Sequence, residues 1–338
     1  MKVTFGYRCA TEEYPATVLL RRAIRAEQVG FEFICVSDHF HPWFHVNGNA
    51  CHSWILSSSI GSLTKKVRIG TGITAPIYRY HPAIIAQAFA TLGQLFPKRI
   101  FLGLGTGEAM NEVPLGFEWP TFKVRYEMFK ESLDIIKLLW SKVFVDYDGK
   151  YFKLRKANLY VKVEDKVPIY IAASGKTVAR LAGKEGDGFM TVGTKLDDYR
   201  MSELKYLLEM VRQGAKEAER NYEDMPKMIE FVFSYNEIYE KALSSILKWR
   251  VGAVPGILNK NIYDPRELDK LGESVDIKNF EKSVFIATNI EECVKATEGF
   301  IKLGFNEIQF HSSSPDEDKF LEEFSKKGLP YLKDTYSY

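Results

Sequence analysis

Apolar residues recur along this chain in two alternating patterns. Short runs rich in β-branched and aromatic residues are typical of buried strands, whereas longer segments with apolar residues three and four positions apart are typical of amphipathic helices. The first pattern predicts strands near residues 2–5, 34–36, 67–70, 100–103, 167–171, 188–190, 228–233 and 306–310.

The segments between these runs carry the helical pattern. Leu20, Ala23 and Ile24 predict one face of a helix that ends at Gly30. Pro82 is placed to open a second helix that continues to residue 95. Further helices are expected at residues 177–184 and along the stripe of Phe129, Leu133, Ile136 and Trp140.

Repeated strand–helix units require parallel strands joined by right-handed crossovers, so the choice lies between an open doubly wound sheet and a closed barrel. About eight repeats without a Pro-, Gly- or Ser-rich linker favour the α/β class and a (β/α)8 TIM barrel. We expect one domain over residues 1–338, with insertions near residues 143–154 and 251–272. The first reads as a hairpin turning at Asp148-Gly149, the second as a Gly/Pro/Asn-rich stretch before a short helix. Insertions at the C-terminal face of a barrel tend to shape its site.

Charge and composition exclude several classes of protein. Among 338 residues, 46 Lys and Arg balance 44 Asp and Glu, which gives no electrostatic case for a nucleic-acid partner. No apolar run is long enough to cross a membrane, and the first residues do not resemble a signal peptide. The four cysteines form no paired motif, so we expect a reduced, cytoplasmic location.

The strongest chemical signal is at residues 36–43, Val-Ser-Asp-His-Phe-His-Pro-Trp, where a buried strand ends at Asp38-His39. Barrel catalysis occurs at such strand ends. A histidine beside a carboxylate that can orient its ring suits proton transfer. The simpler alternative is a capping Asp with a loop His. A metal is not expected, because no acidic residue pairs with His39, His41 and His45 in a ligand pattern.

Glycines follow two other predicted strands. Residues 103–108, Gly-Leu-Gly-Thr-Gly-Glu, resemble a dinucleotide fingerprint, but Glu108 occupies the position of the third glycine. We expect a flat ligand against this backbone with Glu108 pointing into the site; the alternative is a tight turn with an exposed Glu. Residues 69–76 carry two more glycines and give a weaker signal of the same kind.

Residues 173–177, Ala-Ser-Gly-Lys-Thr, lie between a predicted strand and a predicted helix. A phosphate-binding P-loop is excluded, because the position of its leading glycine is Tyr170. Small residues at a helix N-terminus nevertheless favour a phosphate over a simple helix cap, since the first N–H groups have no partner within the helix.

Three segments, residues 37–43, 79–91 and 105–112, together resemble the bacterial-luciferase-like superfamily. More specifically, they are similar to its branch of F420-dependent glucose-6-phosphate dehydrogenases and F420-dependent secondary alcohol dehydrogenases. The resemblance runs the length of the chain. It implies a luciferase-like TIM barrel with insertions, usually a homodimer, that holds coenzyme F420 in the barrel mouth and transfers hydride at C5 of its deazaflavin.

The resemblance also implies which residues form the site. His39 would be the general base, Trp43 would hydrogen-bond the substrate oxygen, and Glu108 would protonate N1. Glu12 matches a further active-site glutamate, whose role is left open. A cis peptide is implied at Gly72-Ile73. The residues implied around the cofactor are Asp38, Thr71, Gly72, Ile73, Thr74, Ala75, Gly107, Glu108 and Asn111 at the ring, and Ala173, Ser174, Gly175, Lys176 and Thr177 at the phosphate.

Members of this branch differ in their substrate, which is either a sugar phosphate or an alcohol. Lys195 and Lys260 match the two phosphate-binding lysines of the sugar-phosphate enzymes, but Ser283 stands at the position of their arginine and Asn261 at that of a histidine. A phosphate site without that arginine lacks a bidentate cation. Residues 111–114, 263–265 and 313–316 are instead shared with the alcohol enzymes.

We therefore expect an F420-dependent enzyme acting on an alcohol or a sugar, with at best an incomplete phosphate site. Four alternatives remain: a glucose-6-phosphate dehydrogenase proper, a methylenetetrahydromethanopterin reductase-like enzyme, an FMN-dependent monooxygenase, and a non-catalytic F420-binding protein. The Lys-, Ile- and Glu-rich composition is compatible with an archaeal source.

Overall fold

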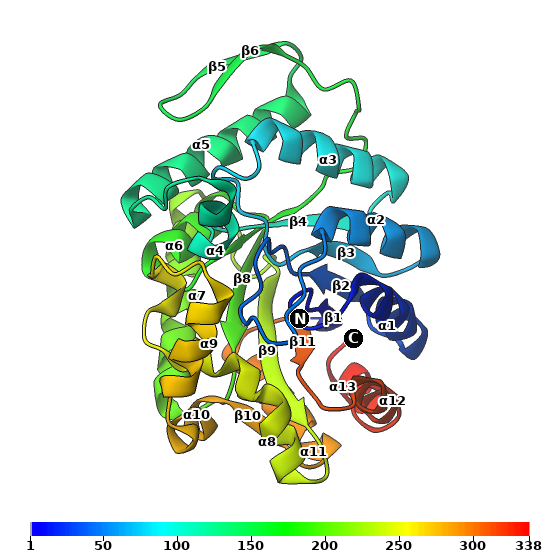
Figure 1. Cartoon of the computed structure of the whole chain (residues 1–338). Coiled ribbons are helices and arrows are strands. Elements are labelled where there is room, and N and C mark those ends of the chain that lie inside the picture. Colours follow the sequence, from blue (N-terminus) through cyan, green and yellow to red (C-terminus); the bar gives the residue numbers. More distant parts are fainter. Residues whose placement is uncertain (1, 338) are drawn as a thin grey trace.

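A closed barrel of eight parallel strands forms the centre of the molecule (Figure 1). The computed structural model describes residues 2–337. The barrel is closed by pairing of β8 with β9, so it has no free edge. In order around the barrel, the strands are β1 (Thr4–Cys9), β2 (Phe33–Val36), β3 (Arg68–Thr71), β4 (Ile100–Leu104), β7 (Ile169–Ala172), β8 (Gly188–Gly193), β9 (Lys227–Tyr235) and β11 (Glu307–Ser312).

Helices surround this barrel, which confirms the predicted TIM-barrel architecture (Figure 1). Each predicted strand is present within a few residues of its expected position. A short additional strand, β10 (Phe285–Ala287), pairs with the end of β9 and was not expected. The helices packed outside are α1 (Ala16–Val29), α2 (Ser53–Leu63), α3 (Pro82–Leu95), α5 (Phe122–Ser141), α6 (Lys176–Glu185), α7 (Asp198–Glu217), α11 (Ile290–Leu303), α12 (Glu317–Lys327) and α13 (Leu329–Tyr336).

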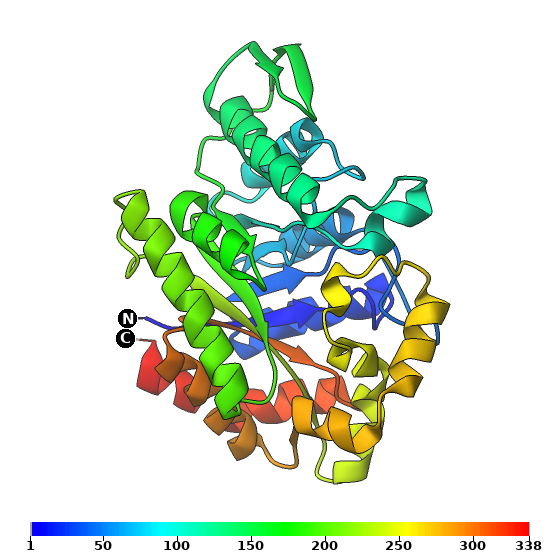
Figure 2. The same ribbon diagram turned by 90° about the vertical axis from the view of Figure 1, so that its left-hand side faces the viewer.

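The two ends of the chain lie together at one side of the barrel (Figure 2). The Val3 amide donates to the Tyr336 carbonyl over 2.9 Å, and the Ser337 hydroxyl donates to the Val3 carbonyl over 2.8 Å. The last helix therefore ties the first strand in place.

The buried face of α1 differs from the predicted one. Leu19, Arg22, Ala23 and Ala26 are buried, whereas Leu20 and Ile24 are partly exposed. Arg22 can turn inward because its guanidinium lies 3.2 Å from the Asp318 carboxylate on α12 and 4.1 Å from the centre of the Tyr14 ring. The pattern of apolar residues cannot predict that Arg22 is buried, because its partner Asp318 is 296 residues away in the sequence.

The predicted hairpin is present as β5 (Val145–Asp148) and β6 (Lys153–Ala157), but it does not shape the mouth. It connects the end of α5 to the start of β7, on the N-terminal side of the barrel. The Glu131 carboxylate of α5 accepts hydrogen bonds from the backbone amides of Lys150, Tyr151 and Phe152 at 2.8 to 3.1 Å. These contacts fasten the hairpin to the outer face of α5.

The second insertion covers the C-terminal mouth, as expected (Figure 2, yellow and orange). The Tyr263 carbonyl lies 3.0 Å from His41 Nδ1. The Asp269 carboxylate accepts hydrogen bonds from the backbone amides of His45 and Val46. The insertion is thereby attached to the loop that follows β2. The segment is longer than the predicted residues 251–272. It comprises α8 (Tyr239–Ile246), the 3-10 turns η2 (Leu247–Ala253) and η3 (Ile257–Asn259), α9 (Pro265–Ser274) and α10 (Ile277–Ser283), and we call residues 239–283 the second insertion.

Within residues 2–337, the helices are all too short or too polar to cross a membrane.

Strands β3 and β4 approach each other closely at Gly103, and a substitution there can test this packing. A Cβ atom at this position would lie 1.9 Å from the Thr71 carbonyl oxygen, which belongs to the backbone of the next strand. We expect Gly103→Ala to lower the free energy of unfolding by about 2–3 kcal/mol, because strand β4 must move away from β3. Gly252→Ala, which would meet no atom within 4 Å, should change it by less than about 0.5 kcal/mol. Urea unfolding of both variants measures the difference; equal stabilities would contradict the packing argument.

Candidate active site

A glutamate and a histidine meet at the mouth of the barrel. β1 and β2 are neighbours, with Cys9 opposite Val36, and each is followed three residues later by one member of the pair, Glu12 and His39. His39 Nε2 lies 3.1 Å from Glu12 Oε1. The Glu12 side chain is 2% exposed and that of His39 10%, so the pair is shielded from water.

The surroundings of Glu12 favour its ionised form. The Ser37 hydroxyl donates to Glu12 Oε2, and Thr11 Oγ1 lies 3.4 Å from the same oxygen. Burial alone would raise the pKa of the Glu12 carboxyl, but the facing His39, the Arg8 guanidinium and the Ser37 hydrogen bond lower that pKa well below its usual range. Glu12 is therefore a permanent anion at neutral pH.

The second nitrogen of His39 faces Glu108 and Asn111. His39 Nδ1 lies 3.6 Å from Glu108 Oε2 and 3.3 Å from Asn111 Nδ2. Burial disfavours protonation of His39, but the charges of Glu12 and Glu108 outweigh it and raise the His39 pKa above its ordinary value. Enclosure in the mouth raises the pKa of Glu108, an effect that His39 partly opposes. His39 thus lies between a permanent anion and a carboxyl that can hold a proton.

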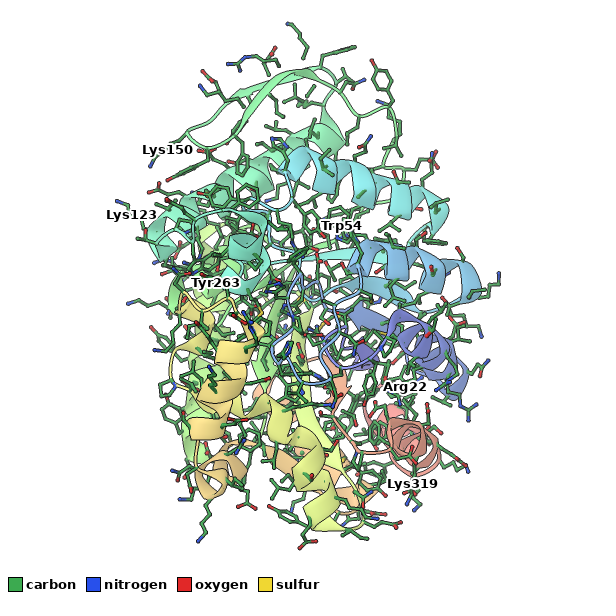
Figure 3. All side chains as sticks on the ribbon, viewed as in Figure 1. Arg22, Trp54, Lys123, Lys150, Tyr263 and Lys319 are labelled. Atoms are coloured by element: carbon green, nitrogen blue, oxygen red, sulfur yellow. The ribbon has the colours of Figure 1, made fainter. Side chains whose placement is uncertain are left out.

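Asp38 does not orient His39, although it is adjacent in sequence. Its carboxylate instead accepts hydrogen bonds from Thr74 Oγ1 at 2.6 Å and Tyr80 OH at 3.4 Å, and lies 3.2 Å from Arg79 Nη2. Trp54, labelled in Figure 3, stacks on the Tyr80 ring at 4.3 Å. The expectation that the neighbouring Asp holds the ring is therefore wrong. Successive residues of a loop point to different sides, and Glu12 from the adjacent strand takes that position.

Trp43 lies in an apolar wall at the mouth. It is 9% exposed and packs in one cluster with Phe44 and Met110 of the barrel loops. The other side of the cluster comes from the second insertion. The wall therefore depends on how that insertion is attached. Its insertion-side members are Val251, Ile257 and Leu268, with Trp249, Val254, Ile262 and Leu271 partly buried beside them.

The glycine-rich strand ends are present where the sequence places them, and the Gly72–Ile73 peptide is cis. The barrel itself requires two of these glycines. A Cβ on Gly72 would lie 2.5 Å from both Arg8 Nη1 and Cys35 Sγ, and one on Gly105 would lie 2.8 Å from Ile73 Cδ1. Gly107 has φ +78°, a conformation that favours glycine. Thr71, Thr74 and Ala75 are buried, and Gly72 and Ile73 are partly exposed at the mouth.

The start of α6 is open to solvent. Ala173 is buried at the end of β7, whereas Ser174, Gly175, Lys176 and Thr177 are exposed. A Cβ on Gly175 would meet no atom within 4 Å, so there is free space above the first turn. The first amides of this ten-residue helix have no acceptors within the helix. An anionic group can therefore approach this turn.

The predicted phosphate-binding lysines are both on the surface. Lys195 follows β8, and Lys260 follows η3 in the second insertion. Both side chains are exposed. Ser283, at the position expected for an arginine, donates through its hydroxyl to the Phe280 carbonyl at the end of α10. None of these three residues contacts His39 or Glu12 in the described structure.

Sequence reasoning missed a second buried charge cluster beside the first. The Glu13 carboxylate faces His311 at the end of β11, and the other His311 nitrogen faces Glu230 of β9, which in turn lies 3.4 Å from Arg8. The available signal was the Glu-Glu pair at the end of the first strand and a histidine at the end of the last. No group of His, Cys, Asp or Glu side chains within residues 2–337 is arranged to hold a metal ion.

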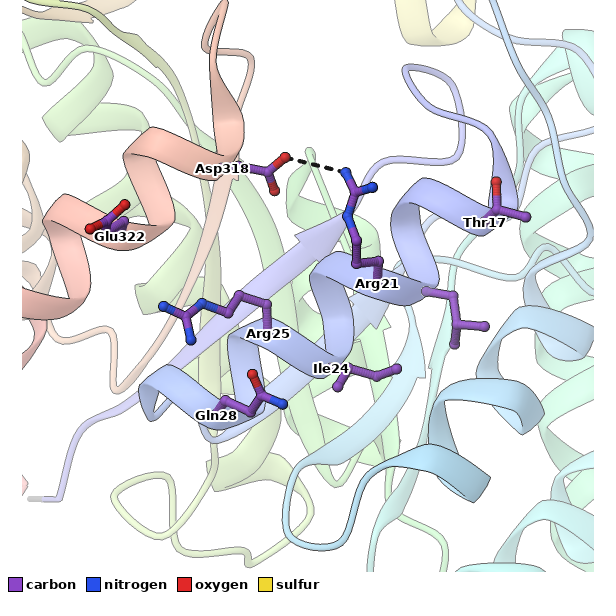
Figure 4. Close-up of a pocket in the computed structure, with 8 residues that line it drawn as sticks. Thr17, Arg21, Ile24, Arg25, Gln28, Asp318 and Glu322 are labelled. Atoms are coloured by element: carbon purple, nitrogen blue, oxygen red, sulfur yellow. Dashed lines mark hydrogen bonds and ion pairs between the residues drawn. The ribbon is translucent and has the colours of Figure 1, made fainter.

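A separate surface groove lies between α1 and α12, on the outside of the barrel (Figure 4). The Arg21 guanidinium faces the Asp318 carboxylate across it at 3.3 Å. Both side chains are more than half exposed. The groove has no histidine or shielded carboxyl among its lining residues, in contrast to the mouth.

Known proteins resemble this chain over nearly its whole length. Residues 3–282 match the family described as Luciferase-like monooxygenase. An F420-dependent glucose-6-phosphate dehydrogenase of Mycolicibacterium fortuitum is 37% identical over 334 residues, covering 98% of both chains. One from Rhodococcus erythropolis is 38% identical over 335 residues, again covering 98% of both.

Among solved structures, an F420-dependent secondary alcohol dehydrogenase in complex with an F420-acetone adduct superposes with a TM-score of 0.93. It is 38% identical, and the match covers 98% of this chain and 99% of that one. A coenzyme F420-dependent tetrahydromethanopterin reductase from Methanopyrus kandleri, at 20% identity and a TM-score of 0.78, shares the fold. The chain belongs to the luciferase-like family, in the branch whose members are named F420-dependent dehydrogenases.

Proposed function

We propose that this protein is a coenzyme F420-dependent dehydrogenase that transfers a hydride between the deazaflavin and the carbinol carbon of an alcohol. The observation that carries the proposal is His39, held 3.1 Å from Glu12 and 3.6 Å from Glu108 at the barrel mouth. Relatives at 37–38% identity over almost the whole chain are named F420-dependent dehydrogenases of alcohols or of glucose 6-phosphate.

The residues present fit this cofactor. The open turn at the start of α6, with free space at Gly175, suits its phosphate. At the mouth, the Asn111 amide and the Glu108 carboxyl offer a donor and an acid for the polar edge of a ring, beside the partly exposed Ile73. We assign the ring to Asp38, Thr71, Gly72, Ile73, Thr74, Ala75, Gly107, Glu108 and Asn111, and the phosphate to Ala173, Ser174, Gly175, Lys176 and Thr177.

When bound, the deazaflavin supplies the hydride acceptor at C5. His39 Nδ1 takes the hydroxyl proton of the alcohol as a general base, for which its ring must be neutral; the other nitrogen, Nε2, keeps its hydrogen and donates it to Glu12. Trp43 orients the alcohol through its indole N–H, a donor only. Glu12 holds the imidazole and stabilises the imidazolium that forms. Glu108, when its carboxyl is protonated, would be the acid that supplies the proton for N1 of the bound cofactor.

These requirements mean that His39 and Glu108 together hold one proton in the productive state. Before the step the proton is on Glu108, and afterwards it is on His39, because His39 has gained the hydroxyl proton and Glu108 has given its own to N1. With 3.6 Å between His39 Nδ1 and Glu108 Oε2, and Asn111 beside both, the proton returns within the pair. No net proton needs to leave the site.

The wall favours a neutral alcohol. The cluster around Trp43 is apolar, and Lys195 and Lys260 are exposed surface residues. Ser283 supplies no charge where the sugar-phosphate enzymes have an arginine. A phosphate ester would therefore lack the bidentate contact that makes such sites strong. Glucose 6-phosphate is the second candidate substrate, because relatives at 37–38% identity are named for it and both lysines are present.

We also propose a homodimer and a cytoplasmic location. Large apolar side chains are exposed on α2 and α3, namely Ile55, Leu63, Ile84 and Leu95, at 52–67% of their area. Such residues on adjacent helices suit a symmetric subunit contact. The four cysteines are free, as in reducing compartments. The archaeal source stays a prediction from composition.

Anaerobic bleaching of the visible absorbance of oxidised F420 tests the proposed function. We expect isopropanol to bleach the cofactor and glucose 6-phosphate to do so far more slowly or not at all. His39→Gln should reduce kcat by about 10²–10⁴-fold while cofactor binding, measured by calorimetry, is kept. Faster turnover of glucose 6-phosphate than of isopropanol would make the sugar-phosphate candidate correct. Bound cofactor without turnover of any alcohol would contradict the dehydrogenase proposal.

The shared proton predicts a bell-shaped dependence of kcat/KM on pH. Activity should rise as the His39–Glu108 pair loses its first proton and fall as it loses the second. Because the pKa of both groups is raised, the acid limb should lie above about 4.5 and the alkaline limb above about 6.5. Glu108→Gln should lower kcat and remove the alkaline limb, leaving a single rise in activity as His39 loses its proton. Glu118→Gln, at an exposed position, is the matched control; an alkaline limb that persists in Glu108→Gln would refute the shared proton.

A further inference from the structure

We propose that Glu13 is a positioning residue that neutralises Lys248 and fixes Trp249 in the wall of the pocket, so that the site selects neutral alcohols over phosphate esters. This inference deepens the proposed function and rests on it. Glu12 and Glu13 are consecutive, yet their side chains serve different partners. Glu12 faces His39, whereas Glu13 faces the second insertion and the end of β11.

Glu13 is saturated with hydrogen-bond donors. Its side chain has no exposed surface. Oε1 accepts from Trp249 Nε1 at 2.9 Å and lies 3.0 Å from His311 Nε2. Oε2 accepts from Ser313 Oγ at 3.0 Å and lies 2.5 Å from Lys248 Nζ. Two of these four donors belong to the insertion and two to the barrel, so a single carboxylate joins the wall to the barrel.

The charges along this cluster alternate. Beyond His311, Glu230 Oε1 lies 2.7 Å from Nδ1, and the other Glu230 oxygen lies 3.4 Å from Arg8. Burial disfavours the charged imidazole, but hydrogen bonds with Glu13 and Glu230 raise the pKa of His311 to about 9, so it is cationic at neutral pH. Glu13 therefore faces two cations. Lys248, 29% exposed, is the one that reaches solvent.

Trp249 packs in the apolar wall that contains Trp43, and Lys248 directly precedes it in the sequence. The Trp249 ring meets Phe44 edge-on at 5.3 Å and His311 at 5.2 Å. Phe44 directly follows Trp43, which we assign to the substrate oxygen, and Lys248 Nζ lies 5.7 Å from the Phe44 ring. An ammonium group at this place is suited to a phosphate ester unless its charge is matched. Glu13 supplies that match, and because the carboxylate is fully buried the pairing is hardly screened by solvent.

The test compares Glu13→Gln, which keeps the side-chain length and one acceptor oxygen but removes the charge and replaces the other oxygen with a donor NH2, with two double variants of the full chain. Binding of glucose 6-phosphate is measured by calorimetry without cofactor, and kcat and KM for isopropanol are measured with F420. We expect Glu13→Gln to bind glucose 6-phosphate about tenfold more tightly, because Lys248 is released. For isopropanol, KM should rise more than kcat falls, since the wall is loosened while Glu12 and His39 are untouched.

Two double variants show whether the gain in affinity comes from the unpaired Lys248 or only from the loss of a negative charge. Glu13→Gln/Lys248→Leu should lose the gain in affinity, whereas Glu13→Gln/Lys241→Leu should keep it, because Lys241 is exposed on α8. A gain that persists without Lys248, or no gain in a folded Glu13→Gln protein, would overturn the inference. If Glu13→Gln does not fold, Glu13→Asp replaces it, because its shorter side chain weakens the contact with Lys248. Glu13→Asp should show a smaller gain in affinity for glucose 6-phosphate, and no gain would contradict the inference.

Failure of this inference is distinguishable from failure of the proposed function. Calorimetric binding of glucose 6-phosphate does not depend on turnover, so it decides the role of Glu13 directly. Oxidation of isopropanol by the wild-type chain decides the proposed function.

Discussion

The arrangement of charged groups at the barrel mouth depends on the contact between Glu12 and His39. Removing a carboxylate from water costs several kcal/mol unless a cation and hydrogen bonds replace the lost hydration. Ser37 and Thr11 surround the carboxylate, Arg8 approaches it from the barrel interior, and His39 faces it at 3.1 Å. The pairing of β1 with β2 brings both groups to the same strand ends. The histidine is consequently fixed in orientation and biased towards protonation, with Glu108 on its other side.

Glu12 and Glu13, which are consecutive in the turn after β1, contact different parts of the molecule. Glu12 faces His39, and Glu13 attaches the second insertion through Trp249, which is part of the wall, and Lys248. A barrel supplies the rigid strand ends, and the insertion supplies the shape of the pocket.

Much of the barrel could be predicted from sequence because each strand is buried on both faces and reads as a short apolar run. The helix from Pro82 to Leu95 was predicted to the residue, since proline marks its start. The face of α1 was predicted wrongly because Arg22 is buried by a partner 296 residues away. Strand β10 has three residues, too few for a pattern.

The site could be predicted in part. Asp38-His39 at a strand end pointed to the mouth, but which carboxylate holds the ring depends on the pairing of two strands, and local sequence suggested the wrong one. The Glu13–His311 contact joins residues 298 apart. Neither partner has a local signal of the contact, because buried ion pairs are formed by topology.

Titration of the His39 ring by nitrogen NMR, in protein with labelled histidine, tests the central claim most directly. The account predicts that His39 stays protonated above pH 6.5, its ordinary pKa, and that Glu12→Gln lowers its midpoint, because the facing anion is removed. A His39 that titrates at or below 6.5 in the wild-type protein, or that is unaffected by Glu12→Gln, would contradict it.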